Sequence, residues 1–336
     1  MKSNLILALK LVVSAGLLAL LFSAVDLRGF AVALVDVDPF YLTIVLALTV
    51  VGSIVVPAMV TKRALPPNQL DLSLFELVRI NLIVRFYTLV LPRGLAAGVR
   101  FMRYRRKGTG QDALALMLFE KISQIFMMTL TGAFFLFVDR DRLPASGDYL
   151  FAVALLGLVA ACLCLLAFLS PRVAPLFHRL LHIAERMTPK AMHGRLRSLS
   201  EAVEAFHGLR AKRIASIFAL SLAGYLMFIL SPYILTFGMG LDLDLRAIAW
   251  IRSLILLMAL VPITIAGLGV REAGFVAFLG LYGIPNHQAL AFSLVLFAMH
   301  IVIGLVGAGL EAWDHLLAPA LKGEPDEEKN VTERPT

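Results

Sequence analysis

The chain has 336 residues, of which 60% are hydrophobic and 16% are charged, and its mean hydropathy is +0.85. About a quarter of the residues of a soluble domain are charged, so the composition and the long uncharged runs of this chain indicate a bilayer as its solvent and exclude a soluble enzyme. Its two cysteines, Cys162 and Cys164, lie in one apolar run and provide neither a disulfide framework nor a zinc site, and we expect no metal or other cofactor.

Six uncharged or nearly uncharged runs are each long enough to cross a bilayer at about 1.5 Å per helical residue. The first is not expected to be a cleaved signal peptide, because a second run follows it almost at once. The sequence predicts an all-α polytopic protein of the plasma (inner) membrane with six transmembrane helices and both termini in the cytoplasm. The predicted spans are residues 5–25, 40–60, 113–138, 149–169, 214–241 and 289–310.

Two further apolar stretches contain charged residues, and we interpret them as re-entrant hairpins that return to the side from which they enter. Residues 72–91 contain Glu76, Arg79 and Arg85. If this stretch crossed the bilayer once, the six basic residues that follow it would lie outside, against the positive-inside rule. Residues 247–284 are the second predicted hairpin. The six basic residues are Arg93, Arg100, Arg103, Arg105, Arg106 and Lys107, and the second hairpin contains Arg252, Arg271 and Glu272 with breaks at Pro262, Gly267 and Gly269.

The net charge of +8 comes from Lys and Arg residues that concentrate between the apolar runs. This distribution is typical of membrane orientation and of contact with anionic lipid, so no nucleic-acid partner is expected. Residues 170–213 form a basic linker whose apolar residues recur at helical spacing, which predicts a cytoplasmic amphipathic helix in the headgroup layer. Residues 318–336 are polar and predict a disordered cytoplasmic tail.

Two passages of the sequence resemble each other. Pro92 is followed after eight residues by Arg100, and Pro262 is followed after nine residues by Arg271, each with glycine shortly before the arginine. Both passages precede an Ala-Leu-Ala triplet that opens the next predicted span. Three predicted crossings separate the copies, so the second copy has the opposite orientation. The sequence predicts inverted repeats over about residues 40–138 and 214–312, an architecture typical of secondary transporters with sites at broken helices.

At these residues the sequence resembles the transmembrane flippase-like region of lysylphosphatidylglycerol synthases and its stand-alone relatives. Residues 262–272 match the pattern Pro-x-x-x-x-Gly-Leu-Gly-x-Arg-Glu, whereas residues 92–100 depart from the family's glycine pattern. The resemblance runs from about residue 5 to about residue 315. It implies a flippase-like domain over residues 1–317 without the soluble aminoacyl-transferring domain. Such a protein moves an anionic lipid, either an aminoacyl-phospholipid or a polyprenyl- or hopanoid-type lipid, between leaflets, and a lipid-synthesising enzyme is a candidate partner.

The repeat motifs suggest how an anionic headgroup could be held in the membrane. Backbone N–H groups at the start of a half-helix after Gly269, together with the guanidinium fork of Arg271, favour a phosphate oxygen. The alternative is that Arg271 and Glu272 pair with each other and that the glycines allow close helix packing. Glu120 is a candidate counter-ion or proton carrier, with a buried salt bridge as its alternative. The remaining candidate substrate contacts are Arg85, Pro92, Gly98, Arg100, Arg252, Pro262 and Gly267.

Two other functions remain open. Three Asp-x-Asp pairs, at residues 36/38, 139/141 and 242/244, could hold a metal ion for a membrane-embedded transferase that uses a lipid-linked donor. Short acidic outer loops explain the same pairs. A regulatory subunit of a lipid-modifying complex is the third hypothesis. His300 is alone in the last span and is expected to be packed or hydrogen-bonded rather than a ligand, and we expect the chain not to be an enzyme.

Overall fold

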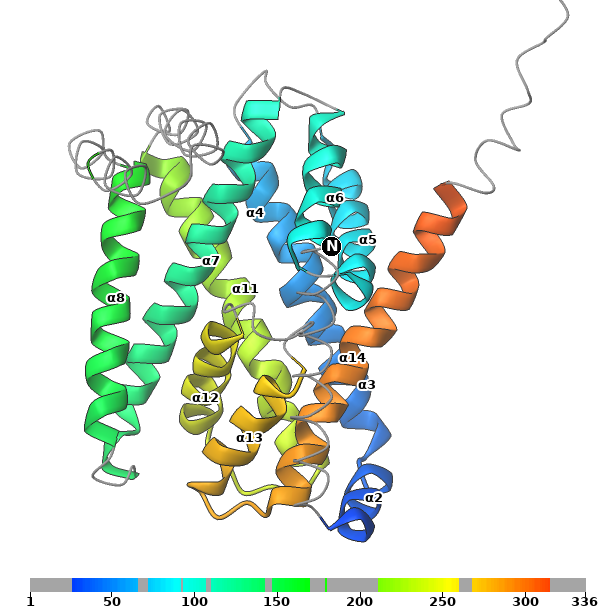
Figure 1. Ribbon diagram of the computed structural model, residues 1–336, viewed down its shortest axis with the longest axis vertical. Helices are drawn as coiled ribbons and strands as arrows, with labels where there is room; N and C mark the ends of the chain where they lie inside the picture. The colour runs from blue at the N-terminus through cyan, green and yellow to red at the C-terminus, as the bar shows by residue number, and fades with distance from the viewer. Residues whose placement is uncertain are drawn as a thin grey trace, which may run out of the picture.

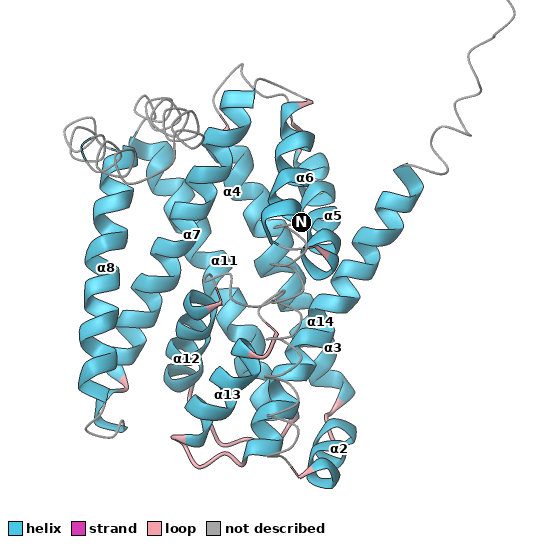
Figure 2. Cartoon of the chain, viewed as in Figure 1, coloured by secondary structure: helices cyan, strands magenta, loops and turns pink. Residues whose placement is uncertain are grey.

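The computed structural model of the chain describes residues 26–65, 72–91, 93–106, 110–142, 147–169, 179, 211–259 and 268–314. Over these residues the protein is helical and contains no strand, as predicted (Figure 2). Long helices run roughly along the longest axis, and shorter helices pack between them (Figure 1). The first predicted span, most of the basic linker and the tail lie outside the described residues.

Four helical segments in the described ranges are long and apolar enough to cross a membrane: Pro39–Ala64, Leu116–Val138, Lys212–Gly238 and Asn286–Ala312. They coincide with four of the six predicted spans. The predicted span at 149–169 lies on a further helix of 23 residues. The helices that carry these segments are α3 (Pro39–Val50), η1 (Val51–Val55), α4 (Val56–Ala64), α7 (Gly110–Val138), α8 (Gly147–Leu169), α11 (Ala211–Gly238) and α14 (Asn286–Ala312).

Short polar side chains determine where several helices begin. Asp38 caps α3 by accepting a hydrogen bond from the backbone N–H of Phe40 at 2.8 Å. Asp26 caps α2 (Leu27–Val35) in the same way, and Ser73 forms a capping box with Glu76 at the start of the next short helix. These polar residues next to the apolar runs therefore have a structural role.

Two pairs of short helices lie between the long ones. The prediction that residues 72–91 form a complete hairpin is wrong, because they form one helix, α5 (Leu74–Val90), and the returning arm is α6 (Arg93–Arg105). The physical reason is that α5 contains neither Gly nor Pro, so its first helix breaker is Pro92. The second pair, α12 (Leu245–Met258) and α13 (Val270–Gly280), lies within the second predicted hairpin, with the break between its arms.

One helix of each short pair packs against a long helix of the other predicted repeat. α5 packs against α14, and α12 packs against α7. α3 and α4, which form one membrane-crossing segment of the first half, pack against α11 of the second half. In Figure 1, α5 and α6 lie in the upper part of the molecule, and α12 and α13 lie in the lower part. The two halves therefore exchange equivalent contacts.

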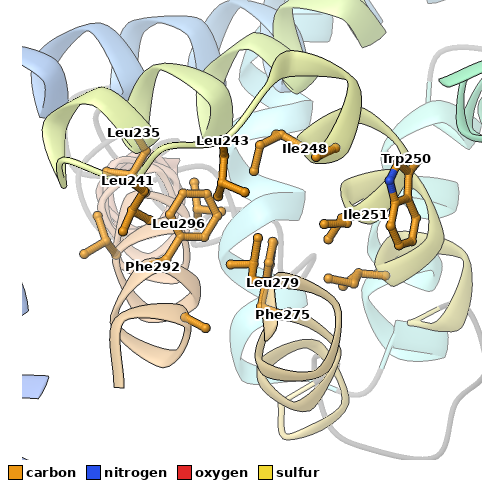
Figure 3. Packing of buried hydrophobic residues seen from close by; sticks show 14 of the residues in the cluster. Leu235, Leu241, Leu243, Ile248, Trp250, Ile251, Phe275, Leu279, Phe292 and Leu296 are labelled. Atoms are coloured by element: carbon orange, nitrogen blue, oxygen red, sulfur yellow. The ribbon is translucent and has the colours of Figure 1, made fainter. Parts of the chain in front are cut away.

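A large buried apolar cluster holds the second short pair in place. Figure 3 shows side chains of α11, α12, α13 and α14 that meet in this cluster. The rings of Phe275 and Phe292 pack edge to face with centroids 5.3 Å apart, and Trp250 packs against Phe278 at 5.5 Å. This packing fixes the position of α12 and α13 relative to the long helices.

The loops gather at two ends of the bundle. At one end the backbone N–H of Asp38 donates to the carbonyl of Gly238 at 3.1 Å, and an ion pair joins Arg142 to Asp244. At the other end, Arg213 donates hydrogen bonds to the backbone where α4 ends. The loops predicted to be outer loops therefore meet at one end. Which end faces the cytoplasm stays a prediction.

Glycines allow α14 to approach α5 closely. A Cβ atom at Gly307 would overlap the backbone carbonyl of Leu82, and one at Gly304 would overlap the side chain of Leu89. A Cβ atom at Gly309, on the same helix, would meet nothing within 4 Å. Small residues at such crossings let backbones approach in membranes, where packing replaces the hydrophobic effect as the main attraction between helices.

We predict that Gly307→Ala destabilises the protein by roughly 1–3 kcal/mol, because α14 must move away from α5 to accommodate the methyl group. Gly309→Ala is the matched control and should be neutral or slightly stabilising, because alanine favours a helix over glycine by about 1 kcal/mol. The measurement is the thermal unfolding midpoint of the purified protein in detergent. Equal midpoints for Gly307→Ala and the wild type would contradict this close crossing.

Candidate functional site

The second repeat motif lies at the start of α13, where Gly269 has a φ of 86°, a backbone conformation that favours glycine. The carboxylate of Glu272 is fully buried and accepts a hydrogen bond from the backbone N–H of Gly269 at 2.7 Å. Its other oxygen pairs with Arg271. Contrary to the expectation from the sequence, the Gly269 N–H is therefore not free to bind a phosphate, because a carboxylate already occupies this helix N-terminus.

Arg252 on α12 and Arg271 on α13 each place a guanidinium group over an aromatic ring. The guanidinium carbon of Arg252 is 4.6 Å from the centroid of the Phe228 ring, and that of Arg271 is 4.5 Å from the centroid of the Phe297 ring. Stacking uses the face of a guanidinium and leaves its N–H groups, which lie in its plane, for acceptors. The Nε atoms of both arginines have no hydrogen-bond partner in the described part of the chain. Two guanidinium groups, each with an Nε–H that has no acceptor among the described residues, therefore lie on the neighbouring helices α12 and α13.

Four helices bring ionisable groups to the same region. Arg252, which is only 3% exposed, is repelled by the charges of Arg271 and of Arg85 on α5. The positive charges of the same three arginines also act on His300 of α14. We call Arg85, Arg252, Arg271 and His300 the central basic cluster. Because its members come from α5, α12, α13 and α14, this cluster lies where the two halves of the chain meet.

His300 is the member that sequence reasoning did not assign to a site. Its Nδ1 donates a hydrogen bond to the carbonyl of Leu296 at 2.7 Å, and its ring packs edge-on against Phe228 with centroids 6.4 Å apart. The histidine is therefore hydrogen-bonded and packed, as expected. Its signal in the sequence was that it is the only ionisable residue of the predicted span 289–310, and ionisable residues within a membrane are candidates for function.

Glu120 on α7 is the centre of a second polar group. Arg100 on α6 donates to Glu120 at 2.9 Å and to the side-chain oxygen of Asn81 at 3.1 Å. Thr61 on α4 also donates to this carboxylate, as does Tyr104 at 3.3 Å. Of the two alternatives for Glu120, the structure has the salt bridge. Sequence reasoning missed the three neutral partners, because residues from three separate helices form no motif along the chain.

Charge is not balanced within this region. Arg100 and Arg271 have carboxylate partners, whereas Arg85 and Arg252 form no ion pair among the described residues, and the buried Nε of Arg252 has no hydrogen-bond partner there. An unpaired charge in hydrocarbon costs at least about 2.5–3.5 kcal/mol. The described part of the chain therefore holds two positive charges near one another and supplies no counter-ion for them.

The structure does not support a site role for Gly98 and does not describe the other three predicted site residues. Gly98 lies within α6 rather than in a turn, and a Cβ atom there would meet nothing within 4 Å. Neither a tight turn nor close packing therefore requires glycine at this position. Pro92, Pro262 and Gly267 lie outside the described residues.

Polar contacts tie each short pair to the end of the opposite long helix. At the end of α7, the buried carboxylate of Asp139 accepts hydrogen bonds from Tyr282 and, at 3.1 Å, from Trp250 on α12; we call these three residues the α7 clasp. At the end of α14, two acidic residues pair with side chains of α5 and α6. We call this second set the α14 clasp, and it comprises Arg79, Tyr87, Arg103, Glu311 and Asp314.

One aspartate of each Asp-x-Asp pair has a structural partner. Asp38 caps α3 and Asp139 belongs to the α7 clasp. The guanidinium of Arg246 donates to Asp244 at 2.9 Å, and this hydrogen bond, followed by the charge of Arg142, holds the pKa of Asp244 below its ordinary value. Within the described ranges, no group of three His, Cys, Asp or Glu side chains could hold a metal ion.

We predict that Glu120→Ala destabilises the protein by about 3 kcal/mol, because it leaves Arg100 partly buried without its carboxylate. Glu120→Gln should cost less, since the amide oxygen still accepts from Thr61 or Tyr104. Lys121→Ala, at the exposed neighbouring position, should change stability by no more than about 0.5 kcal/mol. Thermal unfolding in detergent measures all three, and a wild-type midpoint for Glu120→Ala would show that the salt bridge does not support the fold.

Comparison with known proteins agrees with the membrane architecture. No curated protein matches the chain. A family profile described as Lysylphosphatidylglycerol synthase TM region matches residues 7–307, which include all four candidate membrane spans but for the last residues of α14. This match covers most of the 336 residues and confirms the resemblance noted in the motifs. The chain is therefore a helical membrane protein that belongs to the lysylphosphatidylglycerol synthase TM region family.

Proposed function

We propose that the protein moves an anionic lipid between the leaflets of its membrane and that the central basic cluster binds the headgroup. The observation that carries this proposal is Arg252, which is buried, lies over the Phe228 ring and has no acceptor for its Nε in the described part of the chain. Arg85 adds a second charge without a carboxylate partner there. An anionic headgroup would supply the counter-ion, and the energetic cost of the unpaired charges would become a driving force for binding.

The arrangement of the short helices supports an inverted repeat with two re-entrant hairpins. α12 and α13 have 14 and 11 residues, which correspond to about 21 Å and 16 Å, whereas the hydrocarbon core is about 30 Å thick. Neither helix is long enough to cross it. α5 and α6 enter from one end of the bundle and α12 and α13 from the other (Figure 1). We infer six spans, two hairpins and a site near the midplane where the hairpins meet.

The two clasps suggest how access to this site changes. The α14 clasp joins the first hairpin to the second half of the chain, and the α7 clasp joins the second hairpin to the first half. We propose that opening of one clasp exposes the cluster to one leaflet, whereas opening of the other exposes it to the opposite leaflet. The hydrocarbon chains of the lipid remain in apolar surroundings, and an apolar cavity of about 420 Å³ between α7, α8 and α12 can receive one of them.

The transferase alternative has weaker support. One aspartate of each pair that could have held a metal ion is engaged elsewhere: Asp38 in a helix cap, Asp139 in a clasp and Asp244 in surface ion pairs. We therefore propose that the chain has no transferase activity of its own. The hypothesis of a regulatory subunit is distinguished from a transporter by experiment, because a subunit would not move lipid in purified form.

We predict that Arg252→Gln slows lipid movement by at least about tenfold, because hydrogen bonds to a charged group contribute about 1.5–3 kcal/mol. Arg246→Gln is the matched control on the same helix, since Arg246 is partly exposed and pairs with Asp244 outside the cluster. The measurement is the leaflet exposure of fluorescent phosphatidylglycerol and phosphatidic acid in proteoliposomes with matched amounts of monodisperse protein.

Two outcomes of this assay would contradict the proposal. If the Arg252→Gln variant moved lipid at the wild-type rate, the cluster would not be the headgroup site. If the wild type moved no anionic lipid above the rate of protein-free vesicles, the regulatory-subunit hypothesis would replace transport. A loss of movement in Arg246→Gln as great as that in Arg252→Gln would mean that the effect is not specific to the cluster.

We predict that single cysteines at Asp141 and Asp242 react with an impermeant maleimide from the outer side of the membrane, whereas one at Arg106 reacts only from the cytoplasmic side. All three positions are exposed. Asp141 and Asp242 follow α7 and α11, which end in the lower part of Figure 1, whereas Arg106 follows α6, which ends in the upper part. The native cysteines would first be replaced by alanine. Labelling of Arg106→Cys from outside in sealed cells would contradict the first re-entrant hairpin and the inverted repeat with it.

A further inference from the structure

We infer that the preferred headgroup carries two negative charges, as a phosphomonoester or a diphosphate does. This inference rests on the proposed function and names the substrate class of the same site. Of the four arginines near the meeting point of the hairpins, two are neutralised by carboxylates, and two have no counter-ion in the described part of the chain. A phosphodiester with one negative charge would balance only one of them. A terminal phosphate, with a charge of about −1.5 to −2 at neutral pH, comes close to balancing both.

The orientation of the donors favours a group with several oxygens. Arg252 and Arg271 approach from paired helices, and each guanidinium lies over an aromatic ring while its Nε has no partner in the described residues. Their available N–H groups lie in the plane of each guanidinium, which suits two oxygens on one phosphorus or on neighbouring phosphorus atoms. Arg85, on a helix of the other repeat, adds a further positive charge near Arg252. A phosphomonoester offers three terminal oxygens, whereas a phosphodiester offers two.

The same charges disfavour a headgroup that carries ammonium groups. Both carboxylates near the cluster are already occupied, because Glu120 binds Arg100 and Glu272 binds Arg271 and the N–H of Gly269. An aminoacylated phospholipid with a lysyl group has two ammonium groups against one phosphate. It would therefore enter a site that repels its amines and offers them no free acidic partner among the described residues. We infer that such a lipid is a poorer substrate than its unmodified counterpart.

The experiment compares three lipids with identical acyl chains in proteoliposomes of the full-length protein: phosphatidic acid, phosphatidylglycerol and lysyl-phosphatidylglycerol. We expect phosphatidic acid to move at least about fivefold faster than phosphatidylglycerol, and lysyl-phosphatidylglycerol to move most slowly, after subtraction of the rates in protein-free vesicles. Arg252→Gln should reduce the preference for phosphatidic acid over phosphatidylglycerol, because the cluster then has one uncompensated charge. Arg85→Gln should do the same if Arg252→Gln does not yield folded protein, and Arg246→Gln should retain the preference.

The outcomes separate this inference from the proposed function. Equal rates for phosphatidic acid and phosphatidylglycerol, or a faster rate for lysyl-phosphatidylglycerol, would overturn the inference while lipid transport remains. Movement of none of the three would overturn both. A further arm offers glycerol 3-phosphate, a water-soluble phosphomonoester. If this compound entered the vesicles while phosphatidic acid did not move, the site would belong to a soluble anion rather than to a lipid.

Discussion

The free-energy cost of guanidinium groups inside a membrane protein shapes the centre of this structure. Arg100 and Arg271 are neutralised by Glu120 and Glu272, which come from α7 and α13. Arg252 has an aromatic ring on one face and no acceptor among the described residues. An unpaired charge in hydrocarbon is costly in free energy. Such an arrangement therefore indicates that another process, such as ligand binding, depends on the unpaired charge. Under the proposed function, that process is the binding of an anionic headgroup.

The reciprocal packing of the two halves determines where this charge lies. α5 belongs to the first half and packs against α14 of the second, whereas α12 belongs to the second half and packs against α7 of the first. Neither half could therefore form the central basic cluster alone. The clasps follow the same exchange, since Asp139 on α7 binds Trp250 on α12 and Asp314 after α14 binds Arg79 on α5. Movement of one half relative to the other would change both the clasps and the surroundings of the cluster.

Local sequence signals predicted much of the fold. Uncharged runs predicted four of the membrane-crossing segments, because the required length and apolar character are properties of a single helix. The breaks around Pro262 and Gly269 predicted the separation of α12 from α13. The first hairpin was placed too early along the chain, because the positive-inside rule indicates only on which side the following basic residues lie and does not locate the break. α5 is continuous because Arg79 and Arg85 do not interrupt its backbone hydrogen bonds.

The sequence by itself determined that the chain is a helical membrane protein with charged, broken segments, since hydropathy and helix breakers act locally. It also indicated Arg85, Arg100, Arg252 and Arg271 as candidates for one site. Only the tertiary structure decided which of them are neutralised. Glu120 pairs with Arg100 on another helix although Lys121 is its neighbour in the sequence, and Glu272 takes the adjacent Arg271, which the sequence offered only as one of two alternatives. It also placed His300 beside the arginines. Electrostatic balance depends on distances between side chains of different helices, and these distances are set by packing of the whole bundle rather than by any single segment.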